Sequence, residues 1–434
     1  DPMAENQQPG GAAEVSAAPS RRSFLGGGAA VIGGAGVGLV GYGLGTSRSA
    51  AGSGSAAPAI RSAAGATDAA SGGQLPEWAA ATVPFIGVHQ AGIVTPPQAH
   101  AVFVGLNLVP GTGVDGLRRL MRQWTSDAAR LQSGIPVLGD PQPDLASPAS
   151  RLTVTVGLGR GALAEAKLLD RAPAWLAPLP AFSVDKLQAR WNDGDVLAQV
   201  CSDDPIVLAH AVRALMVSAT GIAVLHWMQR GFRRPVTSTS TMRNLMGQVD
   251  GTAQPTDAEL DQAVWIGAEG PDWLRGGSSL VLRRIQMDLD TWDLLDPQAK
   301  EQVIGRRMTS GAPLTGAKET DVPDLEAKVN GLPVIPDFAH IRHAAVTSPA
   351  MKILRRPYNY DDPVAGTGGG VGGTEAGLLF AAYQRDPMTQ FVPMQQRLAK
   401  NDLLNLWTTP VGSAVFAILP GPAEGETLGQ RLLG

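Results

Sequence analysis

Three short segments of the chain carry side chains that could take part in catalysis. In GQVDGTAQP, Asp250 stands among glycines, which let a backbone bend tightly and come close to a ligand. In DFAHIRHA, His340 and His343 are three residues apart, and the following ILRRPYNY carries Arg355 and Arg356. These residue types can supply a general acid or base, a metal ligand and a fixed positive charge. Taken one at a time, the segments are also explained by an ordinary Asp–Gly turn and by histidines without a catalytic role.

The hydrophobic pattern of the first half predicts the elements that would support such a site. Alternating apolar residues indicate strands, and amphipathic runs indicate helices. The second helix is expected to begin at Asp204 and Pro205, because aspartate caps helices and proline fits their first turn. The order strand, helix, strand, strand, helix, strand is that of a ferredoxin-like unit. The predicted strands are 100–109, 150–159, 195–203 and 223–232, and the predicted helices are 114–132 and 204–219.

The second half predicts a longer version of the same unit, with a loop-rich insertion. Its predicted strands are 278–289, 352–360, 377–386 and 413–421, and its predicted helices are 294–308 and 390–405. We therefore expect an α+β protein made of two ferredoxin-like domains, packed by their antiparallel sheets. The boundary between these domains is expected near residue 245.

The N-terminal part has the layout of an export signal. In SRRSFL, Arg21 and Arg22 precede a stretch without charged residues from Ser23 to Ser47. This pattern is typical of a twin-arginine signal, which exports proteins that are already folded, often with a cofactor inserted. A transmembrane anchor is the alternative, because about twenty apolar residues can span a bilayer. We expect an exported protein, periplasmic or extracellular, that uses the twin-arginine machinery.

The chain is accordingly divided into four regions. Asp1 and Pro2 precede Met3 and are interpreted as an artificial remnant. An Ala/Ser/Gly-rich linker separates the signal from the two domains. The regions are the signal (1–50), the linker (51–74), the N-terminal ferredoxin-like domain (75–245) and the C-terminal ferredoxin-like domain, expected to bind the cofactor (246–434).

Composition excludes several classes of function. The formal net charge is −4 and the mature part contains no run of basic residues, which argues against nucleic-acid binding. Cys201 is the single cysteine, so the chain can form no internal disulfide and no cysteine-ligated metal or iron–sulfur site. We expect Cys201 to be a small buried residue. Six histidines make the search for a histidine-ligated cofactor short.

The chain resembles the dye-decolourising peroxidases, a haem family built from two ferredoxin-like domains in one polypeptide. The resemblance covers essentially the whole mature chain and implies an α+β barrel-like peroxidase fold with one haem b per chain. The export signal and the long insertions are similar to the exported branch of the family, which includes an enzyme proposed to remove iron from haem. The segments that carry it are PFIGVHQAGIVTPPQ, GQVDG, WLRGGSSLVLRRIQMDLDTWD, IGRRMTSGAPLTG, AHIRHA, ILRRPYNY, LLFAAYQRDPMTQFVPMQQRLAKNDLLN and GSAVFAILPG.

The resemblance implies roles for the residues of the three segments. His340 matches the proximal ligand of the haem iron, with His343 as the rival, expected near the iron ligand or at the surface. Asp250 matches the group that moves the proton of hydrogen peroxide on the opposite face. Arg355 matches the distal arginine that stabilises charge on the leaving oxygen. Arg356 alternates to the other face of the strand, where we expect a solvated or propionate-facing charge.

Four further residues follow from the resemblance with less support from the sequence. Asp402 is the candidate partner of the proximal imidazole, although a charged helix end also explains an aspartate there. Gly251 would lie close to the flat cofactor, and Leu378 and Phe380 match the apolar wall over the haem. Core packing alone would also explain Leu378 and Phe380.

The implied activity is the reduction of hydrogen peroxide coupled to one-electron oxidation of dyes or phenolic donors. Because a free aspartate has a pKa of about 3.9, a carboxylate base predicts an acidic optimum. The alternatives are a haem-handling, iron-releasing protein of the same fold and a non-catalytic binding protein. Association of several copies stays open. Aromatic residues that could relay electrons, or be plain core residues, are Trp265, Trp273, Trp292, Trp407, Tyr358 and Tyr360.

Overall fold

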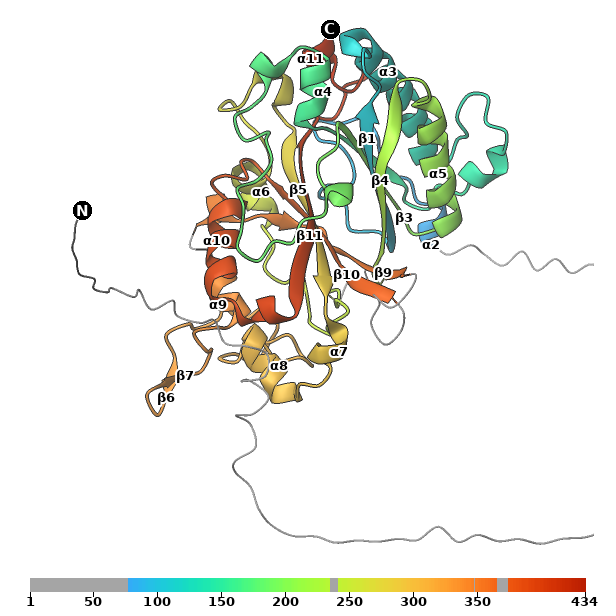
Figure 1. Ribbon diagram of the computed structural model, residues 1–434. Coiled ribbons are helices and arrows are strands. Elements are labelled where there is room, and N and C mark those ends of the chain that lie inside the picture. Colours follow the sequence, from blue (N-terminus) through green and yellow to red (C-terminus); the bar gives the residue numbers. More distant parts are fainter. Residues whose placement is uncertain (1–76, 235–240, 347, 365–373) are drawn as a thin grey trace, which may run out of the picture. The chain divides into compact units, whose positions relative to one another are not determined.

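The computed structural model describes residues 77–234, 241–346, 348–364 and 374–434 (Figure 1). The predicted signal region (1–50) and linker (51–74) lie outside the described residues. Among the described helices, none combines the length and the apolar character needed to cross a bilayer.

The first half forms the predicted ferredoxin-like unit. Its sheet has the strand order β2-β3-β1-β4, with every neighbouring pair antiparallel. The second helix begins as expected: the Asp204 side chain accepts hydrogen bonds from the backbone N–H groups of Ile206 and Val207. The elements are α2 (Glu77–Ala80), β1 (His100–Leu108), α3 (Gly113–Gln132), β2 (Thr153–Leu158), α4 (Arg160–Glu165), β3 (Val196–Ser202), α5 (Pro205–Ser218) and β4 (Ala223–Phe232).

The second half repeats this topology around a long insertion. Its sheet has the order β11-β5-β10-β9, which matches β4-β1-β3-β2 of the first half. The insertion between β5 and β9 carries α7 to α9 and three short strands. The elements are α6 (Leu260–Ala263), β5 (Ser278–Met287), α7 (Leu289–Trp292), α8 (Pro297–Ile304), β6 (Lys328–Val329), β7 (Leu332–Pro333), α9 (His340–Ala344), β8 (Leu354–Arg355), β9 (Tyr358–Pro363), β10 (Thr374–Gln384), α10 (Phe391–Asn401), β11 (Thr408–Ile418) and α11 (Gln430–Leu433).

The two sheets join at both edges, so the strands close into a ring. β4 pairs with β9, and β11 pairs with β2, while β5 and β10 pair within the second half. The ring runs β5-β11-β2-β3-β1-β4-β9-β10 and returns to β5. The α+β fold of two ferredoxin-like units is therefore confirmed, and the described residues from 77 onward form one compact unit.

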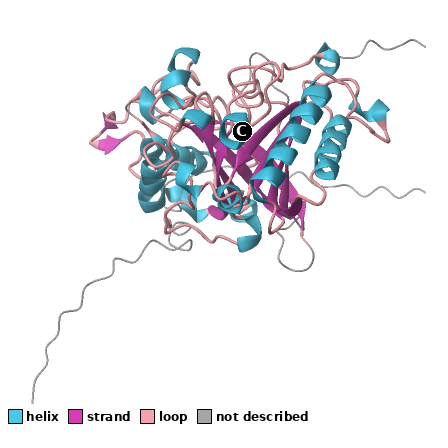
Figure 2. Cartoon of the chain, turned by 90° about the horizontal axis from the view of Figure 1, so that it is seen from above, coloured by secondary structure: helices cyan, strands magenta, loops and turns pink. Residues whose placement is uncertain are grey.

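Apolar side chains fill both sides of this ring. Its interior holds residues of both halves, among them Phe103, Trp227, Leu282, Tyr383 and Phe416. The outer faces are covered by helices, with α3 and α5 on one side of the strands and α9 and α10 on the other (Figure 1). The view from above shows helices on both sides of the central strands (Figure 2). The predicted packing of sheet against sheet thus takes place across the interior of a closed ring.

Two predicted elements are divided in the structure. The strand predicted at 352–360 is split into β8 and β9, because Pro357 has no backbone N–H for the ladder. The helix predicted at 390–405 ends at Asn401, and a separate 3-10 turn follows at Leu403–Leu406. Both breaks lie beside residues that the sequence assigns to the site, Arg355 in the first case and Asp402 in the second.

Candidate active site

His340 is the first residue of α9, a helix of five residues that is too short to be stable alone. Surrounding arginines hold it in place. Arg342 donates a hydrogen bond to the carbonyl of Ile335 at 2.7 Å. Arg397 of α10 donates to the carbonyl of Ala345 at 2.9 Å, directly after α9. The position of His340 is therefore set by tertiary contacts rather than by helix propensity.

His340 pairs with the predicted partner Asp402. Its Nδ1 lies 2.6 Å from Oδ2 of Asp402, whose side chain is only 4% exposed. The other oxygen, Oδ1, accepts a hydrogen bond from the backbone N–H of Leu404 at 2.9 Å, which starts the 3-10 turn. Asp402 is thus a buried partner of the histidine and not a helix-surface residue. Burial acts to lower the pKa of His340, but the charge and the hydrogen bond of Asp402 outweigh it and raise that pKa above its usual value.

The second ring nitrogen of His340, Nε2, is the atom through which the ring could bind a ligand. A carboxylate can only accept, so in the neutral ring the proton is on Nδ1 and the lone pair is on Nε2. Among the described residues, Nε2 has no hydrogen-bond partner, and 32% of the side chain is exposed. Such an oriented imidazole with a free nitrogen is a ready metal ligand.

Asp250 and Arg355 form an ion pair, with Nη1 of Arg355 2.9 Å from Oδ1 of Asp250. Their side chains are 13% and 23% exposed, so the pair is largely but not fully buried. Within the described part of the chain, Oδ2 of Asp250 has no hydrogen-bond partner. The next residue, Gly251, has a φ of +123°, a conformation that side-chain-bearing residues rarely adopt. The sharp turn that presents Asp250 therefore requires glycine.

The His340 pair and the Asp250 pair are coupled electrostatically. The charge of Arg355 lowers the pKa of His340 and that of Asp250 raises it, so both lie within electrostatic reach of the ring. Arg355 pairs with Ala382 on β10, and directly opposite residues of antiparallel strands point to the same face. Leu378 and Phe380 alternate with residues of the interior and share that outer face. The structure thus brings the predicted polar residues and the apolar wall to the same side of the second sheet.

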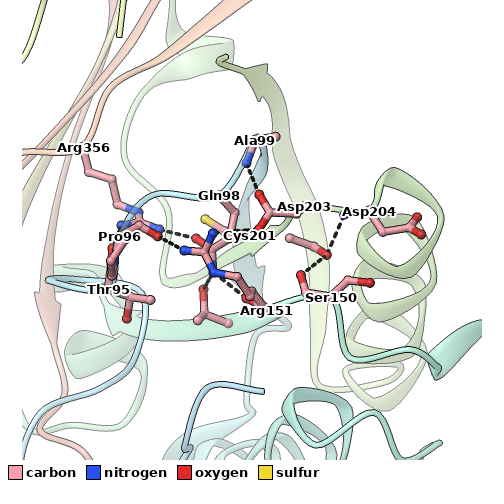
Figure 3. A network of polar contacts seen from close by, with 12 residues as sticks. Thr95, Pro96, Gln98, Ala99, Ser150, Arg151, Cys201, Asp203, Asp204 and Arg356 are labelled. Carbon is pink, nitrogen blue, oxygen red and sulfur yellow. Dashed lines mark hydrogen bonds and ion pairs between the residues drawn. The ribbon is translucent and has the colours of Figure 1, made fainter. Parts of the chain in front are cut away.

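Arg356 corrects one expectation. It does turn to the opposite face from Arg355, but it is neither solvated nor near the His340 site: only 1% of it is exposed. It points into the interior and donates hydrogen bonds to the carbonyl of Thr95 and to Oε1 of Gln98, two residues of the first half (Figure 3). Alternation along the strand explains this outcome, because the opposite face of the sheet lines the closed ring. Arg356 therefore connects the two halves.

The remaining predicted residues lie outside this arrangement. His343 is partly exposed, and its Nε2 lies 2.8 Å from the carbonyl oxygen of Asp337. Cys201 is fully buried in the interior, as expected, with its sulfur 3.6 Å from the Tyr358 hydroxyl. All six aromatic residues considered as relays are buried, namely Trp265, Trp273, Trp292, Trp407, Tyr358 and Tyr360. Core packing accounts for that burial.

The sequence did not indicate the residues that hold the site in place. Gln254 bonds to the backbone of Arg355, and Arg342 and Arg397 hold α9. Their partners are backbone atoms, which leave no residue pattern to recognise. All three residues nevertheless lie inside quoted segments, namely Gln254 in GQVDGTAQP, Arg342 in AHIRHA and Arg397 in LLFAAYQRDPMTQFVPMQQRLAKNDLLN.

Comparison with known proteins identifies relatives over the whole described region. The family models described as Dyp-type peroxidase, N-terminal and C-terminal, match residues 90–233 and 241–423. A dye-decolorizing peroxidase of Thermobifida fusca is 39% identical, over 95% of this chain and 97% of that protein. A deferrochelatase of Shigella sonnei is 32% identical, over 85% and 91%. A crystal structure of a DyP-type peroxidase from Cellulomonas bogoriensis superposes with a TM-score of 0.79 at 50% identity, covering 82% of this chain and 99% of that one.

The sequence and structure matches and the geometry of the site point to the same family. The dye-decolorizing relative is more similar to this chain than the deferrochelatase, at 39% against 32% identity. An oriented imidazole with a free Nε2, an apolar wall and a facing Asp–Arg pair also fit the haem group that this family binds. The chain therefore belongs to the Dyp-type peroxidase family of haem enzymes.

Proposed function

We propose that in this peroxidase Asp250 and Arg355 act on hydrogen peroxide, while His340, supported by Asp402, holds the haem iron. The proposal is supported above all by two polar atoms of the site that are free to bind a ligand. Among the described residues, Oδ2 of Asp250 and Nε2 of His340 have no partner, although each residue is oriented by a hydrogen bond at its other atom. Bound haem supplies the redox chemistry, taking part in two-electron reduction of peroxide and two one-electron oxidations of an organic donor.

Asp250 is suited to move one proton between the two oxygens of peroxide. Its Oδ1 is held by Arg355 at 2.9 Å, so the carboxylate cannot rotate freely and Oδ2 is directed to one place. From there it can accept the proton of one peroxide oxygen and return it to the other, which leaves as water. Arg355 stays charged and can stabilise the negative charge that develops on the leaving oxygen.

His340 and Asp402 have a supporting role on the other side. The Asp402 carboxylate accepts the Nδ1 proton at 2.6 Å and fixes the ring, so that Nε2 is presented as the ligand atom. Such a partner also increases the electron density that the imidazole donates. Leu378 and Phe380 would contact the flat apolar face of the cofactor, because they lie on the same sheet face as Arg355.

The first test is the visible spectrum of the protein with haem supplied, before and after one equivalent of peroxide. We expect a stoichiometric ferric haem spectrum that changes on addition of peroxide, and a lost or altered spectrum for His340→Ala. Bound haem without any response to peroxide would contradict the proposed roles of Asp250 and Arg355.

The role of Asp250 has its own test and control. Asp250→Asn should lower the rate constant for peroxide by about 10²- to 10⁴-fold, the range for lost general acid–base catalysis. Asp203→Asn is the matched control, because Asp203 pairs with Arg151 at 2.8 Å in the first half. The native activity should also have an acidic optimum, since carboxylates accept protons at lower pH than imidazoles. An optimum above neutrality would count against Asp250 as the base.

We also propose export through the twin-arginine machinery. The support is the sequence of the first 50 residues, with Arg21 and Arg22 before an uncharged stretch. Fusing residues 1–50 to a folded reporter should direct it out of the bacterial cytoplasm, and replacing both arginines by lysine should stop this. A reporter that is exported equally well after the double replacement would exclude the twin-arginine route.

A further inference from the structure

The strand that carries Arg355 is short and lies at an edge. β8 consists of Leu354 and Arg355 and, among the described strands, pairs only with β10, through Tyr383 and Ala382. On its other side, an edge strand leaves backbone N–H and C=O groups without a partner strand. Groups left in this way must find water or a side chain, and a two-residue strand on one neighbour is held weakly. The position of the Arg355 backbone therefore needs additional support.

That support comes from one side chain, Gln254. Its Oε1 accepts a hydrogen bond from the backbone N–H of Arg355 at 2.9 Å, and its Nε2 donates to the carbonyl of Arg355 at 2.7 Å. A side-chain amide offers the same donor and acceptor as a peptide group. Gln254 thus takes the place of a neighbouring strand for a single residue, and satisfies both backbone groups of Arg355.

Gln254 also belongs to the turn that presents Asp250. It follows Asp250 by four residues, and its Nε2 lies 3.9 Å from the place that a Cβ on Gly251 would occupy. The same side chain therefore joins the Asp250 turn to the Arg355 backbone. The single hydrogen bond between the Arg355 and Asp250 side chains does not by itself fix the distance between their backbones, because both side chains have rotatable bonds.

We propose that Gln254 is a positioning residue, which locks the Arg355 backbone to the Asp250 turn so that the guanidinium faces peroxide. The inference rests on the proposed role of Arg355. The action of Asp250 and Arg355 then depends on the Gln254 amide as well, because this amide sets the distance between their backbones.

The test is Gln254→Met, which keeps the length of the side chain and removes both hydrogen bonds. Backbone amide exchange at Arg355 should become roughly fivefold faster or more, because one hydrogen bond is worth about 1 kcal/mol. The rate constant for peroxide should fall by up to about a hundredfold, the effect of a misplacement of about 1 Å. Haem content and the KM for the organic donor should stay unchanged.

Gln132→Met is the matched control. Gln132 makes the same type of bridge in the first half: its Oε1 accepts from the backbone N–H of Val154 at 2.9 Å, and its Nε2 donates to the carbonyl of Val83 at 3.0 Å. This variant should change neither amide exchange at Arg355 nor the rate constant for peroxide.

A second variant, Gln254→Glu, gives a readout that a purely structural role would not produce. An ionised carboxylate can accept from the Arg355 N–H but cannot donate to its carbonyl, while a protonated carboxyl group can do both. The peroxide rate constant of the variant, divided by that of the native protein, should rise as the pH falls below about 4.3, the ordinary pKa of glutamate. A ratio that does not change with pH would overturn the proposal.

The outcomes separate this inference from the proposed function. If Gln254→Met leaves the exchange and the peroxide rate constant unchanged while Arg355→Leu lowers that rate constant by about 10²- to 10³-fold, Gln254 does not position Arg355. If Gln254→Met speeds the exchange but neither variant affects the peroxide rate, the role of Arg355 itself is wrong, and the inference that rests on it falls too.

Discussion

Each half of the molecule contains an Asp–Arg ion pair, and the two pairs differ in how much of the carboxylate is used. Arg151 and Asp203 lie 2.8 Å apart in the first half, and Arg355 and Asp250 lie 2.9 Å apart in the second. Their exposures are similar, 22% and 8% against 23% and 13%. Asp203 uses both oxygens, because Oδ1 also accepts from the backbone N–H of Ala99. Among the described residues, Asp250 uses only Oδ1.

Each half also contains a His–Asp pair. His210 lies 2.8 Å from Asp140 in the first half, and His340 lies 2.6 Å from Asp402 in the second. The His210 side chain is 6% exposed, whereas that of His340 is 32% exposed. The histidine of the His–Asp pair is therefore buried in the first half, which we call the closed pair, and partly exposed to solvent in the second half, which we call the open pair.

The comparison shows that the unused oxygen of the aspartate and the exposure of the histidine, and not the type of residue, distinguish the candidate site. Ion pairs and His–Asp pairs are common structural features, and a pair whose polar atoms are all used or buried has no group to offer a ligand. A pair that orients one atom and leaves the second atom open can act on a ligand. The variants below alter matched members of the two halves, beginning with the largest expected effect.

His340→Ala should have the largest effect. Haem binding and peroxide turnover should both be lost, because the proposed iron ligand is removed. In contrast, His210→Ala should leave the haem spectrum unchanged and lower the free energy of unfolding, because it leaves Asp140 without its partner. Absorbance at the haem band and chemical denaturation measure the two effects. Normal haem binding by His340→Ala would remove the proposed distinction between the open and the closed pair.

Arg355→Leu should lower the rate constant for peroxide by about 10²- to 10³-fold while haem stays bound, the range for a lost electrostatic donor. Arg151→Leu should leave that rate constant unchanged. Arg356→Leu should mainly affect stability, because Arg356 is buried and connects the two halves through Thr95 and Gln98. Stopped-flow mixing with peroxide measures the rate constant. A stronger loss with Arg356→Leu than with Arg355→Leu would reverse the assignment of the two arginines.

Asp402→Asn should have a smaller effect, a loss of about 10- to 100-fold in haem affinity or activity, as is usual for the partner of a metal-ligating histidine. The neutral amide can still contact the ring but no longer carries the charge that raises the pKa of His340. The control Asp140→Asn changes the closed pair in the same way and should leave both quantities unchanged. Haem titration and steady-state kinetics decide between these outcomes.

The smallest effect concerns the pH dependence of stability. Burial acts to raise the pKa of Asp140, but hydrogen bonds from the Gln142 N–H and from His210 hold that pKa below its usual value. A lowered pKa means that the folded state binds fewer protons, so Asp140 stabilises the fold above about pH 3.9 and loses this effect as the pH falls further. The difference in unfolding free energy between native protein and Asp140→Asn should therefore be largest near neutrality and shrink in acid. A constant difference from pH 7 to pH 3 would contradict this assignment.

Much of the fold follows from local patterns. The strands, the principal helices and the ferredoxin-like order of both halves were predicted from alternation, amphipathic spacing and the Asp204 cap, because these depend on near neighbours in the chain. Pro357 could have predicted the break between β8 and β9, since proline interrupts a strand ladder. The closure of the ring could not be derived from such patterns, because it depends on pairing between strands far apart in sequence.

The site divides in the same way. The sequence by itself determined the residue types, namely Asp250 in a glycine turn, His340 three residues before His343 and two adjacent arginines on a predicted strand. The tertiary structure decided which of them meet. His340 reaches Asp402 across 62 residues, and Arg355 reaches Asp250 across 105. The tertiary structure also decided that Arg356 is buried, and that Nε2 of His340 and Oδ2 of Asp250 have no hydrogen-bond partner among the described residues. The physical reason is that hydrogen-bond capacity is used up by contacts between distant segments, and a local pattern cannot count those contacts.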